Sequence, residues 1–123
     1  MYFTVEQIDL ACRMKDGGLA WEPRVGNYVY DRSRVCRRDS PFQPRVYFIL
    51  DYACFIRHVG GMEIFRRGMV WLPTWNDLRL VLREGGVDDG EVAAMVAEGI
   101  TEGDELTRLY KKTLQTLDVH LHN

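Results

Sequence analysis

The sequence is poor in cysteine, in long apolar runs and in net charge, and these shortages exclude several classes of protein. Its three cysteines, Cys12, Cys36 and Cys54, are an odd number without Cys-x-x-Cys spacing, so they form no self-contained disulfide set. No apolar run approaches the ~20 residues of a membrane-spanning helix, and residues 1–6 lack the basic start of a signal peptide. We therefore expect a cytoplasmic protein with reduced thiols and no membrane partner.

The net charge is only −2 at neutral pH, but the charged residues are unevenly distributed along the chain. Residues 24–67 contain nine arginines against four acidic residues, whereas residues 76–123 contain ten acidic residues against five basic ones. Such a division can give two parts of one surface opposite electrostatic potentials, and folding can equally interleave the charges and cancel the division. The chain has 123 residues, of which 46% are hydrophobic and 28% charged, which is typical of a single globular domain over residues 1–123.

Helix signals dominate both ends of the chain. Thr4 and Gln7 form the Thr-x-x-Gln capping box of a helix that Gly17 and Gly18 end. Thr74 caps a later helix, and residues 88–97 predict a weaker one. From residue 104 onward, four leucines and Tyr110 fall on one side of a helix and charged or polar residues on the other, which is the clearest amphipathic helix pattern in the sequence.

The middle of the chain contains the strand signals. Alternating β-branched and aromatic residues predict a strand within residues 24–31, and residues 69–72 predict another that ends at Pro73. Residues 46–50 alone fit a buried strand, but the apolar spacing of residues 46–59 favours one central helix that stops at Gly60, followed by a helical turn over residues 62–67. The predicted fold is α+β and mostly helical, with about five helices packed around a small two- or three-stranded antiparallel sheet.

Residues 32–45 carry the sharpest compositional signal. Two prolines and two serines interrupt any apolar period, so we expect an exposed loop, long enough to be functional or disordered. Guanidinium groups bind phosphates in bidentate geometry, and nearby aromatic rings can stack on unpaired bases. The alternative is a solvated loop that pairs with the acidic half of the chain, and the pI of 5.9 argues against a dedicated nucleic-acid binder. The candidate anion-binding residues are Arg32, Arg34, Arg37, Arg38 and Arg45.

Cys54 and His58 are four positions apart, which places a thiol and an imidazole on neighbouring turns of a helix. Such a pair could serve a metal- or thiol-dependent enzyme. Paired zinc-ligand spacing is absent, however, and Cys54 lies between Tyr52 and Phe55 in an apolar run, which favours a buried core thiol. The sequence has no serine-hydrolase, metalloprotease or paired-acid motif, so we assign no catalytic residue, no metal site and no cofactor.

Trp71 and Trp75 concentrate two large aromatic side chains within five residues. One ring is expected to anchor the core where a strand meets a helix. The other is a candidate contact for a partner protein, because tryptophan is enriched at interface hot spots.

Three segments of the sequence resemble small uncharacterised bacterial and phage-associated proteins. They are residues 25–30 (VGNYVY), residues 71–74 (WLPT) before an amphipathic helix, and residues 103–110 (GDELxxLY). The resemblance covers about half of the chain. It implies the order of the elements and a prokaryotic or phage setting, and it implies no activity.

Three functional hypotheses follow from the sequence. The first is a small non-enzymatic bacterial or phage-associated protein that acts through protein–protein contacts as a homo-oligomer or with another protein. The second is binding of single-stranded nucleic acid through the loop of residues 32–45. The third is a metal- or thiol-dependent enzyme that uses Cys54 and His58.

Overall fold

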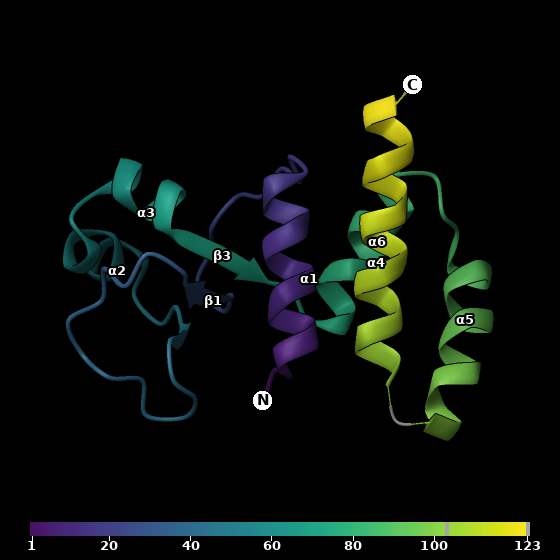
Figure 1. Cartoon of the computed structure of the whole chain (residues 1–123), viewed down its shortest axis with the longest axis horizontal. Helices are drawn as coiled ribbons and strands as arrows, with labels where there is room; N and C mark the ends of the chain where they lie inside the picture. The colour runs from purple at the N-terminus through teal and green to yellow at the C-terminus, as the bar shows by residue number, and fades with distance from the viewer. Residues whose placement is uncertain (103, 123) are drawn as a thin grey trace. The chain divides into compact units, whose positions relative to one another are not determined.

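The computed structural model describes the backbone of residues 1–102 and 104–122, and the side chains of these residues except 96, 98–102 and 118–122. Gly103, which begins the third resembling segment, lies outside the described residues. The described part contains six helices and a three-stranded antiparallel sheet (Figure 1), which confirms the mostly helical α+β class. In chain order the elements are α1 (Val5–Asp16), β1 (Tyr28–Asp31), β2 (Val46–Phe48), α2 (Tyr52–Val59), α3 (Met62–Gly68), β3 (Met69–Leu72), α4 (Trp75–Glu84), α5 (Asp89–Glu102) and α6 (Glu105–His122).

The chain divides into two compact units. Unit 1 consists of Met1–Phe3 and Ala20–Leu72, and unit 2 consists of Thr4–Leu19 and Pro73–Asn123. The division nearly coincides with the uneven charge of the sequence, because unit 1 contains nine basic and five acidic residues and unit 2 seven basic and thirteen acidic ones. The net charges are therefore +4 and −6. The expectation of a single domain over residues 1–123 stays a prediction.

Unit 1 is built on the antiparallel sheet, whose strand order is β2-β1-β3. Central β1 pairs on one side with β2, Val29 opposite Tyr47, and on the other side with β3, Val29 opposite Trp71. The side chains of β1 alternate between half-buried and buried positions, as the period of a strand requires. Val29 thereby points into the core of unit 1.

Residues 46–59 differ from the favoured prediction of one central helix. Val46–Phe48 forms strand β2, and the helix begins only at Tyr52, where the Asp51 side chain accepts a hydrogen bond of 3.0 Å from the backbone N–H of Cys54. Pairing with β1 satisfies backbone groups of β2 across a long sequence separation. The favoured prediction was therefore wrong for the first part of this segment.

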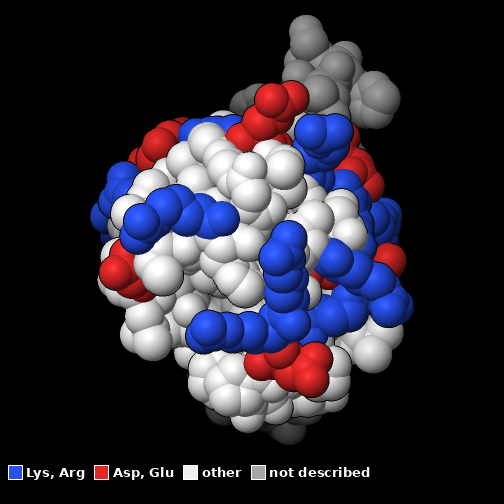
Figure 2. Space-filling model, turned by 90° about the vertical axis from the view of Figure 1, so that its left-hand side faces the viewer, with Lys and Arg blue, Asp and Glu red and all other residues white. Residues whose placement is uncertain are grey.

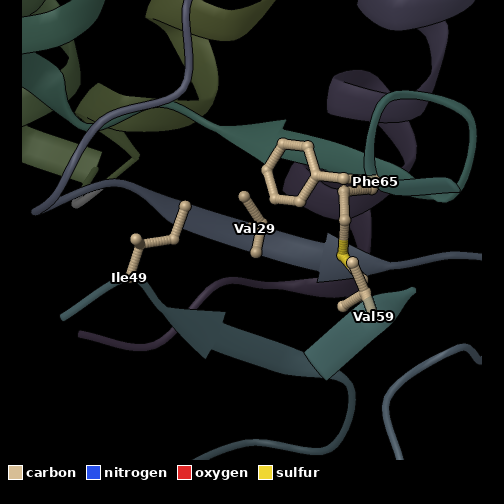
Figure 3. Close-up of a cluster of buried hydrophobic side chains, with 5 residues drawn as sticks. Val29, Ile49, Val59 and Phe65 are labelled. Carbon is tan, nitrogen blue, oxygen red and sulfur yellow. The ribbon is translucent and has the colours of Figure 1, made fainter. Parts of the chain in front are cut away.

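The core of unit 1 forms between the sheet and helices α2 and α3 (Figure 3). Its buried members are Val29, Ile49, Val59, Phe65 and Met69, and the apolar face of α2 packs against them. Burying a large apolar side chain stabilises a fold by about 1.5–3 kcal/mol. This cluster holds the sheet from which the long loop of residues 32–45 departs.

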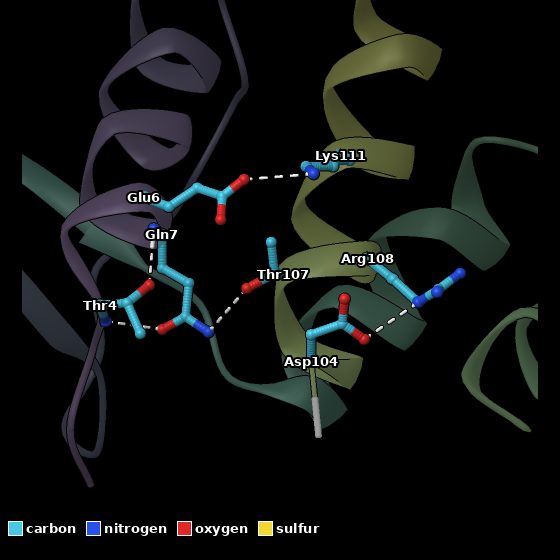
Figure 4. A network of polar contacts seen from close by, with 7 residues as sticks. All are labelled: Thr4, Glu6, Gln7, Asp104, Thr107, Arg108 and Lys111. Carbon is cyan, nitrogen blue, oxygen red and sulfur yellow. Dashed lines mark hydrogen bonds and ion pairs between the residues drawn. The ribbon is translucent and has the colours of Figure 1, made fainter. Parts of the chain in front are cut away.

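In the described residues of unit 2, all regular secondary structure is helical. The predicted capping box is present at the start of α1, where Thr4 and Gln7 exchange hydrogen bonds. The amide of Gln7 also donates to the hydroxyl of Thr107 at 3.2 Å, and Glu6 forms an ion pair of 3.2 Å with Lys111, so polar contacts join α1 to α6 (Figure 4). None of the described helices is both long enough and apolar enough to cross a membrane.

Candidate functional site

The loop of residues 32–45, called the arginine loop below, is organised by the buried carboxylate of Asp31 at the end of β1. Asp31 is only 2% exposed. One carboxylate oxygen accepts a hydrogen bond of 3.0 Å from the backbone N–H of Val35, and the other accepts one of 2.9 Å from that of Cys36. Hydrogen bonds to a charged acceptor are stronger than neutral ones. The first turn of the loop is thus fixed from inside.

Arg45 closes the other end of the arginine loop. Its guanidinium donates hydrogen bonds to the backbone carbonyls of Asp31 at 3.0 Å and Arg32 at 2.7 Å. The same group lies 4.8 Å from the centre of the Tyr30 ring, within cation–π distance. The guanidinium of Arg45 is therefore engaged in contacts within unit 1, although Arg45 is one of the anion-binding candidates predicted from the sequence.

Three of the predicted arginines, Arg34, Arg37 and Arg38, project from this ordered loop and are exposed. Within the described part of unit 1, no carboxylate forms an ion pair with any of them. Figure 2 shows the face that carries the loop, α2 and α3, on which basic side chains outnumber acidic ones. Arg32, the remaining anion-binding candidate, is half-buried, and its backbone carbonyl accepts a hydrogen bond from the guanidinium of Arg45. The exposed loop predicted from composition is confirmed.

Other acidic residues of unit 1 are engaged away from the loop. Glu22 and Glu63 form exposed ion pairs with Arg66 at 3.9 Å and Arg67 at 3.7 Å. Asp51 caps α2. These carboxylates therefore do not neutralise the three projecting guanidinium groups of the loop.

Two weak acids behind the loop stay protonated at neutral pH. Burial raises the pKa of the Cys36 thiol to about 12, and the charge of Asp31 adds to the effect. Burial likewise raises the pKa of Tyr47 to about 12, with the nearby groups Cys36, Asp31 and Asp39 adding to it. The hydroxyl of Tyr47 donates a hydrogen bond to the carbonyl of Arg38, which ties β2 to the loop.

The structure places Cys54 on the surface of α2 and the ring of His58 against the arginine loop. Cys54 is exposed, so the expectation of a buried core thiol was wrong. The core-facing side of α2 carries its aromatic and branched apolar residues, which leaves Cys54 on the outer side. The ring of His58 accepts a hydrogen bond of 3.4 Å from the backbone N–H of Arg37. Among the described residues, no three His, Cys, Asp or Glu side chains are placed to hold a metal ion.

The two tryptophans belong to different units, and both are half-buried. In unit 1 the ring of Trp71 stacks on Trp21, with centroids 5.7 Å apart and an interplanar angle of 3°. In unit 2 the guanidinium of Arg79 lies 5.6 Å from the centre of the Trp75 ring. Trp71 thus has a packing role within its unit, and Trp75 with Arg79 combines two residue types that are enriched at interface hot spots.

Sequence reasoning missed the acidic residues of the site. Asp31 was read only as the end of a strand, although an aspartate before a turn commonly accepts hydrogen bonds from the backbone N–H groups that follow it. Asp39, inside the loop, was counted only as a charge. The exposed ring of Phe42 (64% exposed) also lies in the loop.

No family model matches this chain, and no curated protein and no solved structure matches it either.

Proposed function

We propose that this chain is a non-enzymatic binding protein whose arginine loop binds single-stranded nucleic acid. The observation that carries the proposal is an ordered loop with three exposed guanidinium groups, those of Arg34, Arg37 and Arg38, with which no carboxylate of the described unit 1 forms an ion pair. A loop held in place by Asp31 loses little further conformational freedom when a ligand binds. The non-enzymatic role rests on the lack of a catalytic motif in the sequence.

The charge division of the molecule answers the main objection to this proposal. The pI of 5.9 describes the whole chain, but the loop belongs to unit 1, with nine basic and five acidic residues. The exposed ring of Phe42 supplies a stacking surface in the same loop as the guanidinium groups, and the combination of cations and aromatic rings is typical of single-strand binding. A bacterial or phage-associated protein fits the resemblance seen in the sequence.

The test replaces Arg34, Arg37 and Arg38 together by Gln. Binding of a fluorescent oligothymidylate of about 12 nucleotides is followed by anisotropy between about 20 and 200 mM salt. We expect the variant to lose roughly a hundredfold in affinity at low salt and its salt slope to become shallower by about 2, because each neutralised phosphate of a single strand contributes about 0.7.

The matched control removes three exposed basic side chains from unit 2, by replacing Arg13, Arg83 and Lys111 with Gln. The change in total charge is identical, so an affinity within about threefold of the unmodified protein assigns binding to the loop rather than to overall charge. No salt-dependent binding by the unmodified protein at low salt would contradict the proposal.

Self-association is the second candidate function, and the opposite net charges of the two units favour it. The basic surface of unit 1 of one copy is complementary to the acidic surface of unit 2 of another. The half-buried Trp75, with Arg79 beside it, is the candidate hot spot for such a contact.

Sedimentation velocity at micromolar concentration tests this second candidate. We expect dimers or larger species at about 20 mM salt and monomers above about 0.5 M, because salt screens exposed charge pairs. The triple Arg-to-Gln variant of the loop should remain monomeric in both conditions. A monomer at low salt in the unmodified protein would rule out charge-driven self-association at these concentrations.

A further inference from the structure

A hollow of about 330 Å³ lies beside the arginine loop in unit 1. Ligand sites in proteins occupy about 300–1,000 Å³, so this one is at the small end of the range and suits a single planar ring system better than a whole nucleotide. Both ends of the loop and strand β2 contribute to its wall. The lining residues are Asp31, Arg34, Cys36, Asp39, Ser40, Pro44, Arg45 and Tyr47.

Most polar groups of this wall already have partners within unit 1. The carboxylate of Asp31 accepts two backbone N–H groups, and the guanidinium of Arg45 donates to two carbonyls. The Tyr47 hydroxyl donates to the carbonyl of Arg38, and the Ser40 hydroxyl accepts from the N–H of Phe42 at 3.3 Å. These groups shape the hollow and keep its wall in place.

Two side chains of opposite charge remain available to a ligand. Arg34 and Asp39 are both exposed, and within the described part of unit 1 neither forms an ion pair. A site for phosphate alone would not be lined by a carboxylate as well as a guanidinium, because the carboxylate repels an anion. The ligand that satisfies both groups carries N–H donors for Asp39 and a negative charge for Arg34.

We propose that this hollow holds a guanine base of the bound single strand, with its N1–H and N2–H groups donating to the Asp39 carboxylate. Arg34 binds the adjoining phosphate, and the rings of Pro44 and Tyr47 line the hollow beside the base. This inference rests on the proposed function and adds to it a preference for one base.

Guanine is the base whose Watson–Crick edge matches a carboxylate. It presents two adjacent N–H donors, which pair with the two oxygens of one carboxylate. Adenine and cytosine each present an amino group beside a ring nitrogen that accepts hydrogen bonds and therefore repels the second oxygen. Thymine presents one N–H between two carbonyls, and both carbonyls repel a carboxylate.

The experiment measures anisotropy with oligothymidylates of about 12 nucleotides in which three separated positions are guanine, inosine, adenine or cytosine. We expect the guanine strand to bind about tenfold more tightly than the adenine, cytosine and all-thymine strands. Inosine lacks the 2-amino group, so its strand should lose most of that advantage. The separated positions keep the strands from forming guanine quadruplexes.

The variant Asp39→Asn and its control Glu63→Gln each remove one exposed carboxylate from unit 1. Both should bind oligothymidylate slightly better, because the net charge of the unit rises by one. Only Asp39→Asn should lose the guanine preference, and circular dichroism checks that both variants are folded.

The two proposals fail in different ways. Equal binding of all strands, or a guanine preference that Asp39→Asn retains, would overturn the base assignment and leave nucleic-acid binding standing. Failure of every strand to bind at low salt would overturn both proposals.

Discussion

Replacement of Asp31 by Ala is expected to lower the free energy of unfolding of unit 1 by about 3–5 kcal/mol, a large effect for one side chain. The substitution leaves the backbone N–H groups of Val35 and Cys36 without their charged acceptor in a buried position. Asp31→Asn should cost about half as much, because the amide oxygen can still accept one of the two hydrogen bonds.

Urea unfolding followed by tryptophan fluorescence measures this loss. The measurement is made in a Trp75→Phe background, so that the stacked pair Trp21 and Trp71 of unit 1 is the only source of the signal. Asp39→Ala is the control and should change the stability by no more than about 0.5 kcal/mol, because Asp39 is exposed. If Asp31→Ala were no more destabilising than Asp39→Ala, the carboxylate would not organise the loop.

Substitution of Asp31 also tests whether the order of the loop contributes to the proposed binding of nucleic acid. Loss of the anchor at Asp31 releases the first turn of the loop, so that binding has to order it again at a cost in affinity. The Asp31→Asn variant should therefore bind single-stranded DNA more weakly than the unmodified protein, even though loss of the carboxylate makes its net charge one unit more positive. A tighter complex would show that charge alone governs the interaction.

The thiol of Cys36 is expected to react with iodoacetamide at least a hundred times more slowly than that of Cys54 at pH 8. The reacting species is the thiolate, and the pKa of Cys36 is raised from 9.0 to about 12 by burial and by Asp31, which lowers its thiolate fraction about a thousandfold. Cys54 is exposed to the reagent. Mass spectrometry of peptides after timed quenching measures both rates in one sample.

The unfolded protein in urea is the control for this comparison, because both thiols should there react at the same rate. Asp31→Asn should accelerate Cys36, since it removes the neighbouring negative charge. Equal rates in the folded protein would contradict the raised pKa of Cys36. A Cys54 that reacts faster when folded than in urea would instead support the thiol-enzyme hypothesis.

The raised pKa of Cys36 makes the free energy of unfolding decrease at high pH. Its pKa is higher in the folded state, so the folded protein holds this proton more tightly than the unfolded one. The resulting stabilisation is fully present below pH 9 and is lost as the pH rises from 9 to about 12.

Several parts of the fold could be predicted from the sequence because their causes are local. The capping box at Thr4 and the cap at Thr74 satisfy N–H groups within one turn, and the structure contains both. The same holds for the aspartate at position 88, whose side chain accepts from the N–H of Glu91 at 2.8 Å. The prolines and serines of the arginine loop also act locally, by interrupting any apolar period.

Residues 46–59 show that a local apolar pattern can predict the wrong secondary structure. Its apolar spacing fits a helix throughout, but Val46–Phe48 gains hydrogen bonds by pairing with β1, and only the folded chain brings these residues together. The Asp51 cap was a readable signal for a helix that starts late. Cys54 was judged by its apolar neighbours in sequence, whereas the face of α2 that turns to the core decided its exposure.

The sequence by itself determined the mostly helical class, the unequal charge of the two halves and the exposure of an arginine-rich loop, since each follows from residue type and spacing within a few turns. Only the tertiary structure decided which guanidinium groups are free, that Asp31 anchors the loop, and that Arg34 and Asp39 line the same hollow. The physical reason is that burial, strand pairing and hydrogen bonds between distant residues select partners that no local pattern contains.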